Sequence, residues 1–216
     1  MIHRPTRRYP YETNGQAIYT ESFRQVREGA DLTALAPQEE QVAVRMIHAS
    51  GDLDLPRHIA FHPELVTAAR QALQNGVPIF VDAHMIDAGI TRRRLPAANQ
   101  VRCLLRDPRA ADLAAEWGTT RSAAAVSLWG DELEGAVVAI GNAPTALFHL
   151  LELVADGGPR PAAIIGVPVG FVGSAESKQA LVDSDLGIPW LVVHGSRGGS
   201  AMAASAVNAL ASESER

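Results

Sequence analysis

The sequence predicts an α/β fold whose parallel sheet is covered by helices on both faces. Three apolar runs, at 136–147, 162–178 and 190–201, each break off into a loop rich in Gly, Pro or Ser that opens a helix. Strands of this composition that alternate with helices are typical of parallel sheets buried on both sides. A chain of 216 residues needs no second core, so we expect a single domain over 1–216.

The N-terminal part predicts an irregular arm followed by three helices. Residues 1–15 hold two prolines and an Asn-Gly pair without periodicity, which is typical of irregular structure. Apolar spacing then predicts helices over 17–28, 37–51 and 62–76, the second and third ending at glycine. The sheet therefore follows an N-terminal helical region.

The middle of the chain predicts two further strands and two further helices. The strands fall at 78–82 and 101–105, separated by a loop, and the helical segments at 108–117 and 119–130 follow. The three strand-loop-helix units then complete the fold. The last residues, 211–216, are polar and predict a frayed tail.

Composition excludes several classes of function. A formal net charge of −5 argues against broad nucleic-acid binding and against a polybasic membrane anchor. No run approaches the length of a membrane-spanning helix, and no apolar stretch follows the basic N-terminus, so we expect neither export nor membrane insertion. The one cysteine, Cys103, permits no intramolecular disulfide, which fits a reducing cytoplasm.

The loops after the strands predict a ligand site at one edge of the sheet. The carboxyl ends of parallel strands meet at one edge, where ligands bind. Helix starts present unpaired backbone N–H groups there, so the edge favours a ligand with several anionic or carbonyl oxygens.

A histidine on the second predicted helix is the best candidate for proton transfer. Arg45 and His48 are three residues apart, and Asp52 follows four later, so all three share a face if the helix persists. An imidazole between a guanidinium and a carboxylate can exchange protons near neutral pH. The alternative is a helix-terminal histidine that only favours the helix dipole.

The other histidines have simpler explanations. His58 and His62 are four apart, but the proline after His62 argues against a helix that presents both to a metal. Asp82 and His84 would face the same way if their strand ran on, which leaves a weak metal alternative. His149 lies in an apolar helix and is expected in the core. The sequence thus predicts no metal site.

Glycine motifs give little support to a nucleotide cofactor. Gly166, Gly170 and Gly173 are spaced G-x-x-x-G-x-x-G, and neither G-x-G-x-x-G nor G-x-x-x-x-G-K-[ST] occurs. G-x-S-x-G is also absent, so a serine hydrolase of the nucleophile-elbow type is unsupported. The roles of two polar residues at helix starts stay open: Asn142 caps its helix, faces a ligand or does both, and Arg121 is either solvated or binds a carboxylate.

Seven blocks spread over nearly the whole chain form a specific pattern: A-I-Y-x-x-S-F at 17–23, V-R-M-I-H-A-S-G-D at 44–52, G-I-T-R-x-R-L-P-A at 89–97, T-R-S-A-A-A at 120–125, V-V-A-I-G-N-A-P-T-A-L-F at 137–148, P-V-G-F-V-G-S-A-E-S-K at 168–178 and G-G-S-A-M at 198–202. In these blocks the chain resembles the precorrin-8X methylmutases of cobalamin biosynthesis, called cobalt-precorrin-8 methylmutases in the anaerobic route. The resemblance implies a homodimer and a flavodoxin-like three-layer α/β/α fold, with a mostly parallel sheet and extra N-terminal helices.

The resemblance also implies an isomerase that moves a methyl group from carbon 11 to carbon 12 of ring C, giving hydrogenobyrinic acid or its cobalt counterpart. The methyl group migrates within one molecule, so no cofactor or methyl donor is implied. The family's catalytic histidine falls on His48, as proton donor and acceptor. Its substrate contacts fall on Ser22, Arg45, Thr91, Arg121 and Asn142. The family pattern has arginines where this chain has His194 and Ser196, with Arg197 displaced by one position.

Two other classes of function are distinguishable from this one. A non-catalytic tetrapyrrole carrier would use the same edge to hold the macrocycle, and would be indifferent to loss of His48. A nucleotide-binding flavodoxin-like domain would bind flavin or NAD, and the glycine spacing speaks against it.

Overall fold

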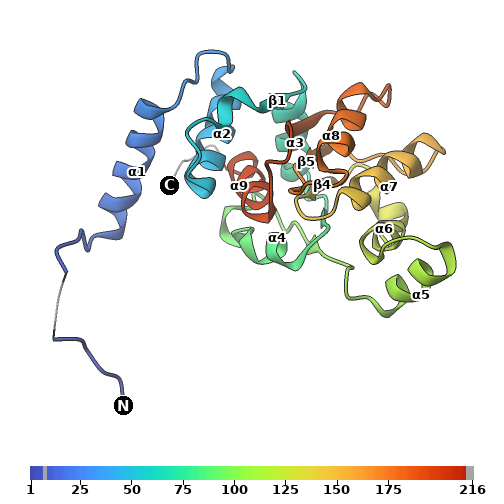
Figure 1. Ribbon diagram of the computed structural model, residues 1–216, viewed down its shortest axis with the longest axis horizontal. Coiled ribbons are helices and arrows are strands. Elements are labelled where there is room, and N and C mark those ends of the chain that lie inside the picture. Colours follow the sequence, from blue (N-terminus) through green and yellow to red (C-terminus); the bar gives the residue numbers. More distant parts are fainter. Residues whose placement is uncertain (7–8, 213–216) are drawn as a thin grey trace.

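The computed structural model describes residues 1–6 and 9–212, which form a six-stranded sheet with helices on both faces (Figure 1). The strands run in the order β1-β6-β5-β4-β2-β3 across the sheet. Their bounds are β1 (Ile59–Phe61), β2 (Ile79–Val81), β3 (Val101–Arg102), β4 (Val137–Ile140), β5 (Ala163–Gly166) and β6 (Trp190–Val193).

Five of these strands are parallel and confirm the predicted α/β class. Numbered among themselves from β2 to β6, they have the spatial order 2-1-3-4-5, which is the flavodoxin-like order. The direction of winding reverses between β2 and β4, where Ile79 pairs with Val137. In sheets of this kind, ligands bind beyond the carboxyl ends of the strands at that point.

Helices cover the sheet on both faces. The helices of the described chain are α1 (Gly15–Gly29), α2 (Pro37–Ser50), α3 (Leu65–Gln74), α4 (His84–Gly89), α5 (Pro108–Trp117), α6 (Arg121–Ser127), α7 (Pro144–Ala155), α8 (Ser174–Asp183) and α9 (Ser200–Leu210), with 3-10 turns η1 (Leu55–Arg57), η2 (Arg92–Arg94) and η3 (Gly130–Leu133).

The period-two alternation of β4 divides the buried residues between two apolar clusters. Val137 and Ala139 lie in one cluster, with residues of α2, α3 and α9. Val138 and Ile140 lie in the other, with residues of α6, α7 and α8. The three-layer arrangement is thereby confirmed. The helix α1 packs on α2 and extends away from the rest of the molecule (Figure 1).

Several short elements differ from the sequence prediction. The strand β1 was not expected, because three residues carry almost no periodicity and its antiparallel partner β6 is distant in sequence. The stretch expected to be a loop before β3 contains α4 and η2, which are too short to show a helical pattern. The helix expected over 119–130 ends at Ser127, and η3 follows it.

The predicted arm contains no helix or strand in residues 1–6 and 9–14. Its end supports α1, because the Asn14 side chain accepts hydrogen bonds from the N–H groups of Gln16 and Ala17. Of the predicted polar tail, 213–216 lie outside the described residues. Among the helices that the structure describes, none has both the length and the apolar character needed to cross a bilayer.

Candidate active site

A histidine and a serine meet between α1 and α2. His48 lies in the last turn of α2, and its Nδ1 is 2.8 Å from the Oγ of Ser22 on α1. The His48 ring stacks on Phe23, with ring centroids 4.9 Å apart, and lies 5.3 Å from Tyr19. Hydroxyl and rings together fix the orientation of the imidazole. Tyr19 and Phe23 were not predicted from the sequence as site residues. Their spacing from Ser22 places all three on one face of a helix, at i, i+3 and i+4, and this spacing was the signal that could have identified them.

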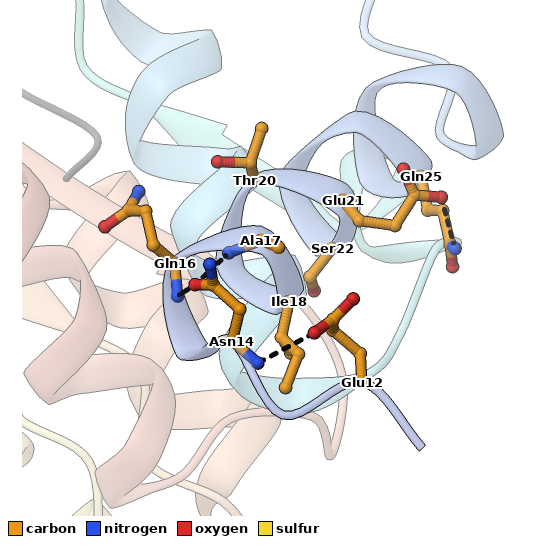
Figure 2. A pocket seen from close by; sticks show the side chains of 9 residues that line it. All are labelled: Glu12, Asn14, Gln16, Ala17, Ile18, Thr20, Glu21, Ser22 and Gln25. Carbon is orange, nitrogen blue, oxygen red and sulfur yellow. Dashed lines mark hydrogen bonds between the residues drawn. The ribbon is translucent and has the colours of Figure 1, made fainter. Parts of the chain in front are cut away.

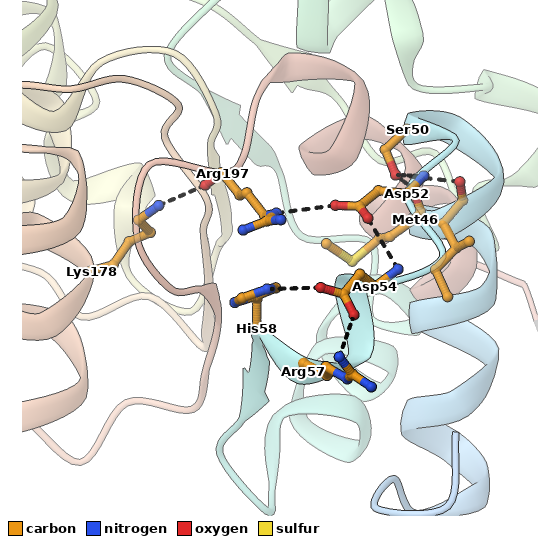
Figure 3. A network of polar contacts seen from close by, with 9 residues as sticks. Met46, Ser50, Asp52, Asp54, Arg57, His58, Lys178 and Arg197 are labelled. Atoms are coloured by element: carbon orange, nitrogen blue, oxygen red, sulfur yellow. Dashed lines mark hydrogen bonds and ion pairs between the residues drawn. The ribbon is translucent and has the colours of Figure 1, made fainter. Parts of the chain in front are cut away.

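The predicted partnership of His48 with Asp52 is wrong. The helix α2 ends at Ser50, because Gly51 adopts the left-handed conformation with φ of 69°. Asp52 therefore leaves the helical face and accepts a hydrogen bond from the Nε of Arg197, at 3.2 Å (Figure 3). The polar partner of His48 is instead the hydroxyl of Ser22.

Arg45 lies beside this pair, as its spacing from His48 predicts. The residue is buried, and its guanidinium donates to the Tyr19 hydroxyl at 2.8 Å and lies over the Phe23 ring. Partial burial lowers the pKa of His48 below its usual 6.5, and the nearby charge of Arg45 lowers it further. The imidazole is therefore mostly neutral at pH 7 in the free protein.

A second arginine extends the positive charge of this region. Burial lowers the pKa of Arg94, and the charge of Arg45 contributes to the same shift, as expected of two cations at close range. Asn208 of α9 holds the segment from Thr91 to Arg94 in place. Its Oδ1 accepts from the N–H of Thr91 at 2.8 Å, and its backbone oxygen accepts from the Nε of Arg94. A pair of guanidinium groups suits a ligand that carries several carboxylates.

One predicted anion site is already filled by the protein itself. The carboxyl group of Asp82, at the end of β2, accepts hydrogen bonds from the N–H groups of Gly141, Asn142 and Ala143 at 2.9, 3.1 and 2.6 Å. The start of α7 was expected to be open to a ligand, and that expectation is wrong. Burial raises the pKa of Asp82, while the three N–H bonds favour its charged form.

The weak metal alternative at Asp82 and His84 gains no support from this geometry, since both Asp82 oxygens are engaged by backbone N–H groups. Over residues 1–6 and 9–212, no three His, Cys, Asp or Glu side chains are grouped so that they could hold a metal ion.

Two predicted contact residues, Arg121 and Asn142, lie on the other side of the sheet edge from His48. Arg121 begins α6 and Asn142 precedes α7, and both are exposed. The starts of the two helices are tied together by a hydrogen bond of 2.8 Å between the hydroxyls of Thr120 and Thr145. Asn142 does not cap α7 with its side chain, because Asp82 fills that role. The helices α6 and α7 cover the opposite face from α2.

A hollow of about 820 Å³ follows α1 and the end of the arm. Figure 2 shows its lining, in which Ser22 is the residue shared with the His48 pair. Glu12 and Glu21 also line it, and Glu21 forms an ion pair with Arg24. Carboxylates on its wall make the hollow a poorer host for a polyanionic ligand than the arginines at Arg45 and Arg94.

Comparison with known proteins gives a consistent result. The sequence pattern of the family described as precorrin-8X methylmutase matches residues 17–213. A precorrin-8X methylmutase from Sinorhizobium sp. is 56% identical over 94% of this chain and 97% of its own, and one from Pseudomonas aeruginosa is 52% identical over 95% and 99%. The crystal structure of a precorrin-8X methylmutase from Thermus thermophilus superposes with a TM-score of 0.83 at 40% identity, over 91% of this chain and 95% of the other. This chain belongs to the precorrin-8X methylmutase family, whose members are isomerases of cobalamin biosynthesis.

Proposed function

We propose that this chain moves the methyl group on carbon 11 of precorrin-8X to carbon 12, giving hydrogenobyrinic acid, with His48 as the acid-base catalyst. The observation that carries the proposal is the Ser22–His48 pair, oriented by two aromatic rings beside the buried guanidinium of Arg45. This arrangement places an imidazole, which can exchange protons near neutral pH, beside a guanidinium that can bind a substrate carboxylate. Membership of the family supports the same reaction.

The proposed reaction is an isomerisation, in which every atom of the substrate is retained. The imidazolium of His48 gives a proton to the conjugated macrocycle, which makes the ring system more electron-poor. The bond between the methyl group and carbon 11 then breaks as the bond to carbon 12 forms. Loss of a proton from the macrocycle back to His48 then restores the imidazolium and gives the product. General acid-base assistance of this kind contributes about 10²- to 10⁴-fold to a rate.

Ser22 serves both protonation states of His48. Its hydroxyl accepts from Nδ1–H in the charged ring, and still accepts from Nδ1–H in the neutral ring that remains once Nε2 has given up its proton. The Nε2 atom is thus left to exchange the proton with the substrate.

Substrate binding is expected to load His48 with its proton. In the free protein, burial and the charge of Arg45 hold its pKa below 6.5. Carboxylates of the bound substrate would pair with Arg45 and reverse part of that effect. We therefore expect the pH limb of kcat to lie above that of kcat/KM, since these report the complex and the free enzyme.

The remaining predicted residues are proposed as contacts to the periphery of the macrocycle. Thr91 lies three residues before Arg94 in the segment that Asn208 holds, and Arg121 and Asn142 lie on the other side of the sheet edge. Replacement of Arg121 should raise KM more than it lowers kcat. No cofactor or metal enters the proposed reaction. We assign a metal-free substrate because the two relatives that are over half identical carry the name precorrin-8X methylmutase.

We further propose that the protein is a cytoplasmic homodimer. The helix α1 extends from the body and exposes Ile18, with Tyr9 and Tyr11 exposed in the arm before it (Figure 1). Apolar groups on a projecting element are typical of a surface that meets a partner. Cys103 as a free thiol fits the reducing cytoplasm.

The experiment is the visible spectrum of the protein mixed with precorrin-8X, for wild type, His48→Ala and a control, His62→Gln. His62 is a matched control because it lies at the edge of the sheet opposite the carboxyl ends of the parallel strands. Its backbone N–H donates there to the backbone oxygen of Trp190, at the start of β6. Wild type and the control should form hydrogenobyrinic acid, and His48→Ala should bind without conversion. Equal conversion by all three would remove His48 from the mechanism, and binding without conversion by all three would indicate a carrier.

A further inference from the structure

Lysine is used at a single position of this chain. The sequence has 19 Lys and Arg residues, of which Lys178 alone is lysine. Its side chain is fully buried, at 0% exposure. Burial of an ammonium group is costly, so a lysine kept only there points to a task that an arginine on the surface does not perform.

The ammonium of Lys178 joins two loops at the carboxyl edge of the sheet. From α8, its Nζ donates to the backbone oxygen of Pro168 at 3.1 Å. It also donates to the backbone oxygen of Arg197 at 2.7 Å (Figure 3). Pro168 follows β5, and Arg197 follows β6. Ser174, at the start of α8, donates to the same Pro168 oxygen at 2.7 Å. We refer to residues 167–173 and 194–199 as the two rim loops.

Further contacts lead from Arg197 to α2, the helix that carries His48. Arg197, whose backbone the ammonium holds, donates from its side chain to Asp52. Asp52 comes directly after Gly51, which ends the helix that carries His48. A series of named contacts thus runs from Lys178 through Arg197 to the C-terminal end of α2 (Figure 3).

The space between the rim loops suits a compact donor. A Cβ atom on Gly198 would lie 2.2 Å from the backbone oxygen of Val167, so the loops are in close contact there. A planar guanidinium is larger and presents its donors in a rigid fork, whereas an ammonium directs three N–H groups from one atom. Burial lowers the pKa of Lys178 to about 8, which leaves it mostly charged at neutral pH.

We infer that Lys178 is a positioning residue for the methyl shift: its buried ammonium fixes the two rim loops and, through Arg197 and Asp52, the end of α2 that presents His48. The catalytic part of this inference rests on the proposed function. The structural part does not, because it concerns only the order of the loops.

The test compares Lys178→Met, Gln179→Lys and the double variant that combines them. Gln179 is the exposed neighbour, and lysine there can still pair with Asp183, so the double variant restores the net charge but not the buried ammonium. Hydrogen exchange of residues 167–173 and 194–199 is measured without substrate. kcat and KM are measured with precorrin-8X.

We expect faster exchange of both rim loops in the two variants that lack Lys178, and wild-type exchange in Gln179→Lys. In the same two variants kcat/KM should fall by about tenfold to a hundredfold, the usual effect of misplacing supporting groups. Wild-type exchange and kinetics in Lys178→Met would overturn the inference. Looser loops in Lys178→Met together with an inactive wild type would instead refute the proposed function and leave only the structural part of the inference, the ordering of the loops.

Two further variants keep the inference testable if Lys178→Met does not fold. Lys178→Gln retains a donor amide and should recover part of the loop protection. Asp52→Asn leaves the buried ammonium untouched, and should lower kcat with little change in KM or in exchange of 167–173. Wild-type kcat in Asp52→Asn would show that the contact with α2 has no role in positioning.

Discussion

Among single residues, the neighbours of His48 set its protonation and thereby the proposed proton transfer. The imidazole is held by Ser22 and two rings, and the cation that would bind substrate also lowers its pKa. The guanidinium of Arg45 therefore affects both the proposed binding of substrate and the protonation of His48. This coupling can be separated by measurement, because binding and titration report on it independently.

Replacement of Arg45 by methionine should move the His48 titration upward. Burial is the larger cause of the lowered pKa and remains, so we expect the midpoint to approach 6.5 without exceeding it. Activity that requires the imidazolium is lost as the pH rises through this midpoint, so the limb of kcat/KM should move to higher pH while KM rises. NMR of the histidine Cε1–H signal measures the midpoint. Arg102→Met, on the distant strand β3, is the control and should leave it unchanged.

The single lysine permits a direct titration of Lys178. Protein labelled with [¹³Cε]lysine should give one side-chain signal with a midpoint of about 8 instead of 10.5. Since the folded pKa is the lower one, the unfolded chain binds more protons between these values, and the free energy of unfolding should rise with pH across that window. Below pH 8 Lys178 is charged in both the folded and the unfolded protein, so burial of its charged ammonium lowers the free energy of unfolding by its full amount. A midpoint near 10.5 would contradict the buried position.

At the scale of elements, side chains from distant segments hold the helix starts and rim loops of the site. Asp82 ends β2 and caps α7 through three N–H groups. Close contact of the loops after β5 and β6 requires glycine at Gly198. Both features shape the edge of the sheet before any ligand arrives.

Replacement of Asp82 by asparagine should destabilise the fold. The amide can present an NH₂ group to backbone donors, and loss of charge-assisted bonds at a buried site costs about 2 to 3 kcal/mol. Urea unfolding measures the change. Asp112→Asn, at an exposed position of α5, is the control and should stay within about 0.5 kcal/mol of wild type. Equal stability of both variants would show that the cap is dispensable.

Two glycines of the last rim loop separate backbone strain from close contact. Gly195 has φ of 74° and open space where a Cβ would lie, so Gly195→Ala should cost about 1 kcal/mol. Gly198 has φ of 149° and a Cβ there would lie 2.2 Å from the Val167 oxygen, so Gly198→Ala should cost about 3 kcal/mol or more. Thermal unfolding compares them, and a similar loss for both would contradict the close contact.

Elements with a local sequence pattern could be predicted, the short strands β2 and β3 among them, whereas β1 and α4 could not. The end of α2 at Gly51 follows from apolar spacing and one glycine, because both signals are local. The strand β1 depends on hydrogen bonds with β6, and α4 has six residues, so neither leaves a local pattern.

At the scale of the whole molecule, the sheet order brings distant segments to one edge. The proposed contacts approach that edge from both faces, with His48 on one side and Arg121 on the other. The face shared by Arg45 and His48 was predicted from spacing, because it is local to one helix. The contact of Ser22 with His48 follows from the packing of α1 on α2 and was not predicted, since the family resemblance implied Ser22 only as a substrate contact.

The proposed homodimer gives a prediction for the assembled molecule. Light scattering coupled to gel filtration should give twice the chain mass of 23.0 kDa at micromolar concentration. Ile18→Glu, on the projecting helix α1, should weaken the assembly because it places a charge on an exposed apolar position. Thr20→Glu, also exposed on α1, is the matched control. A mass of 23.0 kDa for wild type would contradict the dimer.

The most direct test follows the migrating group itself. Precorrin-8X labelled with ¹³C at the methyl group on carbon 11 is mixed with excess wild type or His48→Ala, and the bound corrinoid is examined by NMR. We expect the label to move to carbon 12 with wild type and to stay on carbon 11 with His48→Ala, although both proteins bind the substrate. Transfer at the wild-type rate by His48→Ala would contradict the role of His48 as the acid-base catalyst.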